Sequence, residues 1–176
     1  MTLANRVTLA RIVLIPLVII LLLFGLDGLA FIVFMFLSFS DAVDGYIARR
    51  FGEVSDLGKV LDPLADKILV TTVLIALVGL GKASSIPVML FVVRDLIVSG
   101  IRITAAKENN IIAASNLAKW KTGTQIAAVA MLILSLPLAG LVLWVAVILS
   151  YISGGAYLWQ SKTLKLLNPT IVGKSS

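Results

Sequence analysis

Four aspartates between positions 41 and 66 are the residues of this chain best suited to chemistry. They form two pairs, Asp41 with Asp44 and Asp62 with Asp66, spaced three and four residues apart. On an α-helix either spacing places both carboxylates on one face, so two facing helices would bring four carboxylates around one point. Oxygen ligands without cysteine or histidine favour Mg²⁺, Mn²⁺ or Ca²⁺ over zinc. The sequence therefore predicts a divalent-cation site at these aspartates.

The segments that carry these carboxylates are strongly apolar, and a carboxylate in such a segment is costly unless a cation holds it. Gly45 and Ala48 lie near the same helix face as Asp41 and leave room beside the carboxylates. Such small side chains could admit a flat ligand such as a nucleobase, or let two helices pack closely.

The complete pattern over residues 41–66 is D-x2-D-G-x2-A-R-x8-G-x3-D-x3-D. It matches, without departure, the signature of the CDP-alcohol phosphotransferases, which are integral membrane enzymes of phospholipid synthesis. The resemblance implies transfer of a phosphatidyl group from a CDP-linked lipid to an alcohol, with release of CMP and with two bound Mg²⁺ or Mn²⁺ ions. It also implies that Asp66 is the general base as well as a metal ligand. The implied CDP-lipid site includes Gly45, Ala48, Arg49 and Gly58, with Arg49 on a phosphate.

The N-terminal residues add to this resemblance. Members of the family often carry Pro-Asn-x-x-Thr-x-x-Arg, and this chain has Asn5, Thr8 and Arg11 in register, with Ala4 in place of the proline. The resemblance places Asn5 and Thr8 in the CDP-lipid site. The alternative is ordinary capping and snorkelling at a membrane edge.

The composition predicts an all-α polytopic membrane protein with a single domain over residues 1–176. The chain is 60% hydrophobic and has a mean hydropathy of +1.08. A helical crossing needs about 20 mostly apolar residues, so the length allows about six crossings. Residues 1–9 are expected to form a short interfacial helix or the start of a helix. The expected spans are about 10–26, 29–50, 58–80, 86–107, 116–136 and 139–160.

The distribution of charge predicts the orientation. Lys and Arg outside the spans lie almost entirely at the termini and after the second and fourth spans, which places both termini and the active site on the cytoplasmic side of the cell membrane. The net charge of +6 suits anionic lipid headgroups and phosphorylated substrates. Nucleic acid is a weaker interpretation because the basic residues are dispersed. The absence of cysteine and histidine excludes disulfides, Cys nucleophiles and His bases.

The expected acceptor site lies on the fourth and fifth spans. The run R-D-L-I-V-S-G-I-R at 94–102, followed by K-W-K-T at 119–122, resembles the phosphatidylglycerophosphate synthase branch of the family. That resemblance implies CDP-diacylglycerol and glycerol 3-phosphate as substrates, and a homodimer. Residues expected to bind the acceptor phosphate are Lys59, Arg94, Arg102, Lys119 and Lys121. Lys119 and Lys121 cannot share a helix face, so one of them is expected in the cavity. An internal Arg–Asp pair that only fixes helix register is the alternative for Arg94.

Other functions remain open at this level. Inositol phosphate, serine or phosphatidylglycerol could be the acceptor; the cations disfavour serine, whereas inositol phosphate stays open. A small cation or proton transporter would also use carboxylates inside a membrane. It would need polar residues through the outer halves of the spans, and segments such as 69–80 and 131–134 are almost entirely apolar.

Overall fold

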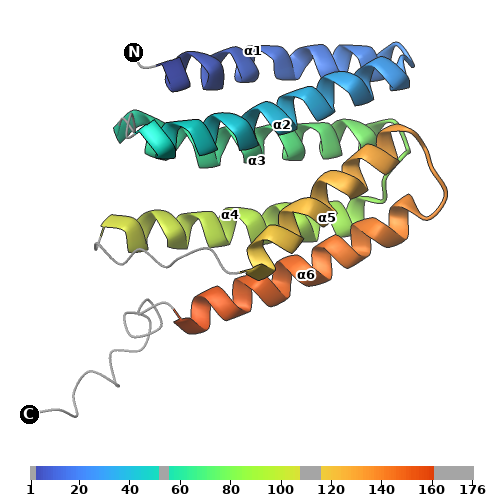
Figure 1. The fold of residues 1–176 in the computed structure, drawn as a ribbon. Helices are drawn as coiled ribbons and strands as arrows, with labels where there is room; N and C mark the ends of the chain where they lie inside the picture. The colour runs from blue at the N-terminus through green and yellow to red at the C-terminus, as the bar shows by residue number, and fades with distance from the viewer. Residues whose placement is uncertain (1–2, 52–55, 108–115, 161–176) are drawn as a thin grey trace, which may run out of the picture.

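The structure, a computed structural model, describes residues 3–51, 56–107 and 116–160, with side chains for 13–40, 67–101 and 120–155. These residues form six helices and no strand, which confirms the all-α class (Figure 1). The helices are α1 (Leu3–Leu23), α2 (Asp27–Phe51), α3 (Asp56–Gly79), α4 (Ser85–Lys107), α5 (Asn116–Ile133) and α6 (Ala139–Gln160). Within the described parts of the chain, no helix combines the length and the apolar character that crossing a membrane requires.

The N-terminal segment is the start of a helix and not a separate one. Helix α1 is continuous from Leu3 to Leu23, so residues 3–9 form its first turns. No glycine or proline interrupts residues 3–15, and nothing in the backbone therefore ends the helix there. Of the two expected alternatives, the start of a helix is confirmed and the separate interfacial helix is wrong. From α2 onward, each helix begins within two residues of the expected start.

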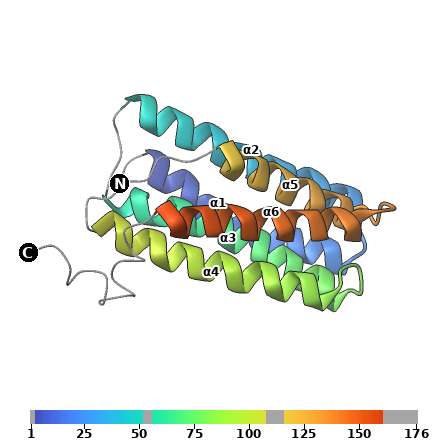
Figure 2. The same cartoon turned by 90° about the horizontal axis from the view of Figure 1, so that it is seen from below.

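The helices run back and forth along one long axis. The turns between α1 and α2, α3 and α4, and α5 and α6 gather at one end, on the right of Figure 1, while α1 begins at the other. Helix α1 packs on α2 and α3, and α6 packs on α4 and α5, so α6 lies between those two helices in the view of Figure 2.

Helix α3 is the centre of the apolar core. Leu69, Val70, Val73, Leu74 and Leu77 are almost completely buried. They recur at helical spacing, and α3 contacts α1, α2, α4 and α5. Since burial of a large aliphatic side chain stabilises by about 1.5–3 kcal/mol, α3 is held firmly in register with its neighbours. The position of the residues next to this run, including Lys67, is fixed by that packing.

The three short turns use one hydrogen-bond pattern. After α1, Leu26 N–H donates to the Leu21 carbonyl at 2.9 Å, and Gly25 has a φ of 70°. The same pattern follows α3, where Gly81 has a φ of 71°, and α5, where Ser135 has a φ of 50°. A left-handed residue at this position satisfies the last carbonyls of a helix, and glycine adopts it without strain. Ser135 therefore holds a strained backbone in a turn of the same kind.

Lys82 ties this end of the bundle together. Its Nζ lies 2.5 Å from Asp27 Oδ2 and donates to the Ile133 carbonyl at 3.2 Å. The lysine follows α3, Asp27 begins α2, and Ile133 ends α5. One ammonium group therefore links three helix ends, opposite the end at which α1 begins.

Candidate active site

The two halves of the aspartate motif lie on neighbouring helices. Residues 41–49 belong to α2 and residues 58–66 to α3, and these helices contact each other. Asp41 stands ten residues before Phe51, where α2 ends, and Asp66 stands ten residues after Asp56, where α3 begins. At 1.5 Å per residue, both positions lie about 15 Å from the end at which α2 leads into α3. The fold therefore brings the two halves to one level.

The side chains of residues 41–66 lie outside the described ones. The side chains of residues 1–12 lie outside the described ones as well. Two roles therefore remain predictions: metal ligation by Asp41, Asp44, Asp62 and Asp66, and CDP-lipid binding by Asn5, Thr8, Gly45, Ala48, Arg49 and Gly58. Among the side chains that are described, no group of three or more acidic, cysteine or histidine residues could hold a metal.

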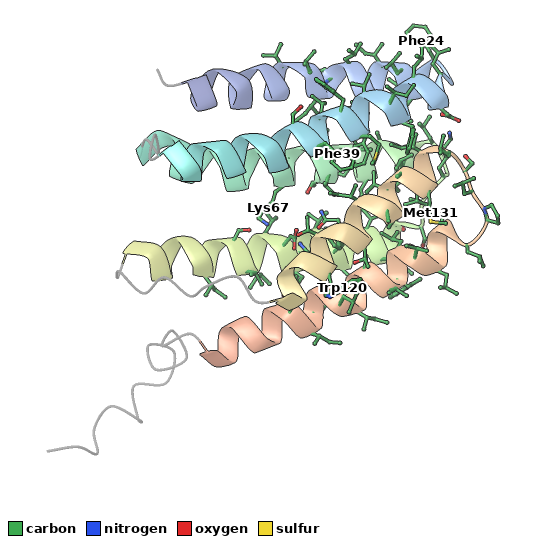
Figure 3. All side chains as sticks on the ribbon, viewed as in Figure 1. Phe24, Phe39, Lys67, Trp120 and Met131 are labelled. Atoms are coloured by element: carbon green, nitrogen blue, oxygen red, sulfur yellow. The ribbon has the colours of Figure 1, made fainter. Side chains whose placement is uncertain are left out.

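A group of charged side chains, of which Lys67 is partly exposed and the other three are buried, begins directly after the motif. It consists of Lys67 on α3, Arg94 and Asp95 on α4, and Lys121 on α5, and is called here the Asp95 cluster. Arg94 Nη1 donates to Asp95 Oδ1 at 2.7 Å, and Lys121 Nζ lies 2.8 and 3.0 Å from the two carboxylate oxygens. Lys67 Nζ lies 3.7 Å from Asp95 Oδ2. Figure 3 shows Lys67 extending from α3 toward α4. One carboxylate thus joins three helices.

Local packing fixes the members of the Asp95 cluster. Arg94, Asp95 and Lys121 are 7%, 4% and 9% exposed, so water reaches little of them. The Lys121 ammonium lies 5.0 Å from the centre of the Phe91 ring, a cation–π contact that adds to its ion pair. On the other side, Gly154 of α6 approaches Arg94 so closely that an added Cβ would lie 3.0 Å from the guanidinium nitrogens. Glycine at this position leaves space for the buried arginine.

The charges of the Asp95 cluster do not balance among the described side chains. It contains three cations and one carboxylate, and the Arg94 Nε is buried without a hydrogen-bond partner in this part of the chain. Buried cations are costly unless an anion or a hydrogen-bond acceptor satisfies them. An arrangement of this kind is chemically suited to a further anion such as a phosphate.

The structure brings together two of the residues predicted to bind the acceptor phosphate. Arg94 and Lys121 both contact Asp95, so the Lys121 side chain points into the bundle. The internal Arg–Asp pair considered for Arg94 is present. Lys59, Arg102 and Lys119 lie outside the described side chains, so their roles stay predictions.

Asp95 and Lys67 are cluster members that the sequence-based site did not include. A signal for Asp95 was available, since it is the only acidic residue between positions 83 and 107, a segment that contains two arginines. Lys67 gave a weaker signal: it follows Asp66, but one step along a helix turns a side chain by about 100°, away from the face of its neighbour.

A sequence model of the CDP-alcohol phosphatidyltransferase family matches residues 1–152 of the chain. The chain belongs to this family, and the resemblance drawn from the aspartate motif is confirmed.

The chain is also similar in sequence to individual proteins with assigned names. The chain is 39% identical over 178 aligned residues to the Bacillus subtilis CDP-diacylglycerol–glycerol-3-phosphate 3-phosphatidyltransferase, covering 88% of this chain and 92% of that protein. The protein of the same name from Rickettsia typhi is 38% identical over 175 residues, covering 92% of this chain and 97% of that protein. A Mycoplasma genitalium protein of that name is 46% identical over 91 residues, 51% of this chain and 39% of that protein.

Proposed function

We propose that the chain transfers the phosphatidyl group of CDP-diacylglycerol to sn-glycerol 3-phosphate, giving phosphatidylglycerophosphate and CMP. Membership of the family and the names of the relatives support this activity. The structural observation that carries it is the Asp95 cluster, whose Lys67 directly follows Asp66 on α3. A phosphorylated acceptor carries the negative charge that these buried cations favour.

The motif residues of α2 and α3 would bind the donor and start the transfer. Gly45, Ala48, Arg49 and Gly58, with Asn5 and Thr8, would hold the CDP-lipid, with Arg49 on a phosphate. Asp66 would accept the proton of the acceptor hydroxyl. The hydroxyl oxygen then bonds to the β-phosphorus, and the bond from that phosphorus to the CMP oxygen breaks. Most of the catalytic effect comes from positioning and from electrostatic stabilisation.

The donor set fits a divalent metal. The motif supplies four carboxylates from two contacting helices at one level, and hard oxygen ligands suit Mg²⁺ or Mn²⁺. Asp41, Asp44, Asp62 and Asp66 would hold two such ions. When bound, the metal would neutralise charge on the phosphoryl and leaving oxygens.

The Asp95 cluster would receive the phosphate of glycerol 3-phosphate through Arg94 and Lys121. Lys59, Arg102 and Lys119 would complete this cationic set. Because Lys67 adjoins Asp66 in sequence and reaches Asp95 in space, a phosphate held here would keep the acceptor hydroxyls near the proposed base. The inositol phosphate alternative shares this chemistry, so the product must distinguish the two acceptors.

We also propose that the chain is a multi-pass protein of the cytoplasmic membrane, with its termini and active site on the cytoplasmic side, and that it forms a homodimer. Two features support the membrane location. The donor is a lipid, and large apolar side chains on the outside of the bundle are exposed, among them Phe24 (77%), Val13 (75%), Phe36 (66%) and Leu96 (65%). Extensive exposed apolar surface favours contact with lipid or with another protein.

The test is product analysis with purified protein and radiolabelled CDP-diacylglycerol, offered each acceptor separately. Phosphatidylglycerophosphate should form with glycerol 3-phosphate, and little or no product should form with serine or phosphatidylglycerol. Efficient transfer to inositol phosphate would instead favour that acceptor. Absence of transfer, combined with cation flux in proteoliposomes that contain no nucleotide-lipid, would favour the transporter.

A further inference from the structure

Asp95 has the geometry of a residue that aligns other residues. Its two carboxylate oxygens receive contacts from α3, α4 and α5: Oδ1 from Arg94 and Lys121, Oδ2 from Lys121 and Lys67. The Asp95 side chain is 6% exposed, so water does not replace any of these partners. Every nearby cation in the described region is therefore oriented by this one side chain.

Without Asp95, the two ammonium groups would not stay together. Lys67 and Lys121 carry the same charge, and like charges repel most strongly where little water screens them. Both contact Asp95 Oδ2, at 3.7 and 3.0 Å, so the shared oxygen keeps them close to each other. One phosphate can contact both ammonium groups only when they lie close to each other.

The two lysines differ in how tightly they are held. Lys121 makes two short contacts and has an 11% exposed side chain, whereas Lys67 makes one longer contact and has a 21% exposed side chain. Lys67 is therefore the member with room to turn toward an incoming anion while Asp95 retains Lys121. Lys67 follows Asp66 on α3, so an anion that it contacts would lie close to the level at which the motif ends.

We propose that Asp95 is a positioning residue for the acceptor: it holds Lys121 and Lys67 so that both contact the phosphate of glycerol 3-phosphate. This role rests on the proposed function. It is distinct from a purely structural Arg–Asp pair, because the effect of Asp95 is transmitted to the acceptor through the lysines.

The first measurement compares Asp95→Asn with the unaltered protein, using the full chain purified in detergent. The KM for glycerol 3-phosphate should rise about tenfold or more, since charge-assisted contacts lose their alignment, while the KM for CDP-diacylglycerol changes little. Asp95→Glu keeps the charge and should recover part of the loss. If Asp95→Asn does not fold, Asp95→Glu still displaces the ammonium groups and should raise only the acceptor KM.

Asp27→Asn is the matched control. It makes the same carboxylate-to-amide change and also removes a lysine partner, but its Lys82 pair lies at the turn end of the bundle. It should leave both KM values unchanged. An equal rise of the acceptor KM in Asp27→Asn and Asp95→Asn would overturn the positioning role.

A double-mutant cycle separates positioning from structure. If Asp95 acts through Lys121 and Lys67, Asp95→Asn should raise the acceptor KM of Lys121→Met by less than it raises that of the unaltered protein, because one of the two groups that it aligns is already absent. Fully additive effects on KM, or equal weakening of both substrates, would overturn the inference. Failure of the unaltered protein to use glycerol 3-phosphate would overturn the proposed function and the inference with it. Normal turnover by the unaltered protein with an unchanged KM in Asp95→Asn would overturn the inference alone.

Discussion

Gly154 offers a sharp test of the packing around Arg94, because its neighbour Gly155 is a matched control. A Cβ at position 154 would lie 3.0 Å from Arg94 Nε and Nη2 and 3.2 Å from Val98 Cγ2. A Cβ at position 155 would meet nothing within 4 Å. Both glycines lie inside α6, so Gly→Ala gives each the same gain in helix propensity, about 1 kcal/mol. The difference between the two variants therefore reports the contacts of the added Cβ with Arg94 and Val98.

The expected magnitude follows from the confinement of the arginine. Arg94 is 7% exposed, and its Nη1 donates a hydrogen bond to Asp95 Oδ1 at 2.7 Å, so the guanidinium has little freedom to move away. Overpacking of this kind costs about 1–3 kcal/mol, which offsets or exceeds the helix gain. Gly155→Ala should be neutral or stabilising, and Gly154→Ala should be less stable than Gly155→Ala by about 1–3 kcal/mol.

Thermal unfolding of both variants in the same detergent measures the difference in stability. Steady-state kinetics with glycerol 3-phosphate measure the effect on acceptor binding. For a chain of this length, each kcal/mol shifts the midpoint by about 2–4 °C. The KM for glycerol 3-phosphate should rise about threefold to tenfold in Gly154→Ala, because the displaced arginine weakens a charge-assisted contact. If the two variants have the same unfolding midpoint and the same KM for glycerol 3-phosphate, the conclusion that Gly154 confines the Arg94 guanidinium is wrong.

Three further outcomes test other parts of the molecule. Chelation should abolish turnover, and Mg²⁺ or Mn²⁺ should restore it, because four carboxylates without soft ligands favour these ions; full activity after rigorous metal removal would exclude the metal site. Asp66→Asn should abolish turnover in a CMP-release assay yet retain binding of CDP-lipid, and parallel loss of both would reassign Asp66 to primary metal ligation. Ser135→Gly should raise the free energy of unfolding by about 1 kcal/mol, since glycine adopts the φ of 50° without strain; no change in the midpoint would show that the serine backbone is relaxed.

The helices were predictable because they are long apolar runs, and the ends of α1 and α3 are marked by a recognisable residue. Gly25 and Gly81 end the runs of α1 and α3, and both adopt the left-handed conformation that glycine favours. The end of α5 was expected near residue 136, but the helix ends at Ile133. Ser135 makes that turn, and a serine gives no sign in the sequence that its backbone is left-handed. The sequence left open whether residues 1–9 start the first helix or form a separate interfacial helix, because polar residues are spread among the apolar ones there; α1 begins at Leu3.

The Asp95 cluster could be predicted only in part. Arg94 and Lys121 were expected in one acceptor site, and they meet. From the sequence, Asp95 was expected on one face of the fourth span with Ser99 and Arg102, or as a partner for Arg94 that fixes helix register. Its contacts with Lys67 and Lys121 join residues 28 and 26 positions away, so they depend on how α3, α4 and α5 pack. Local spacing contains no information on that packing.

The most direct measurement compares glycerol 3-phosphate with glycerol as acceptors for the purified protein, with CMP release and lipid product followed together. The two acceptors share two hydroxyls and differ at the phosphate, which is the group assigned to the buried cations of the Asp95 cluster. Phosphatidylglycerophosphate should form at concentrations at which glycerol gives no detectable product. Comparable transfer to glycerol would contradict phosphate recognition by these cations.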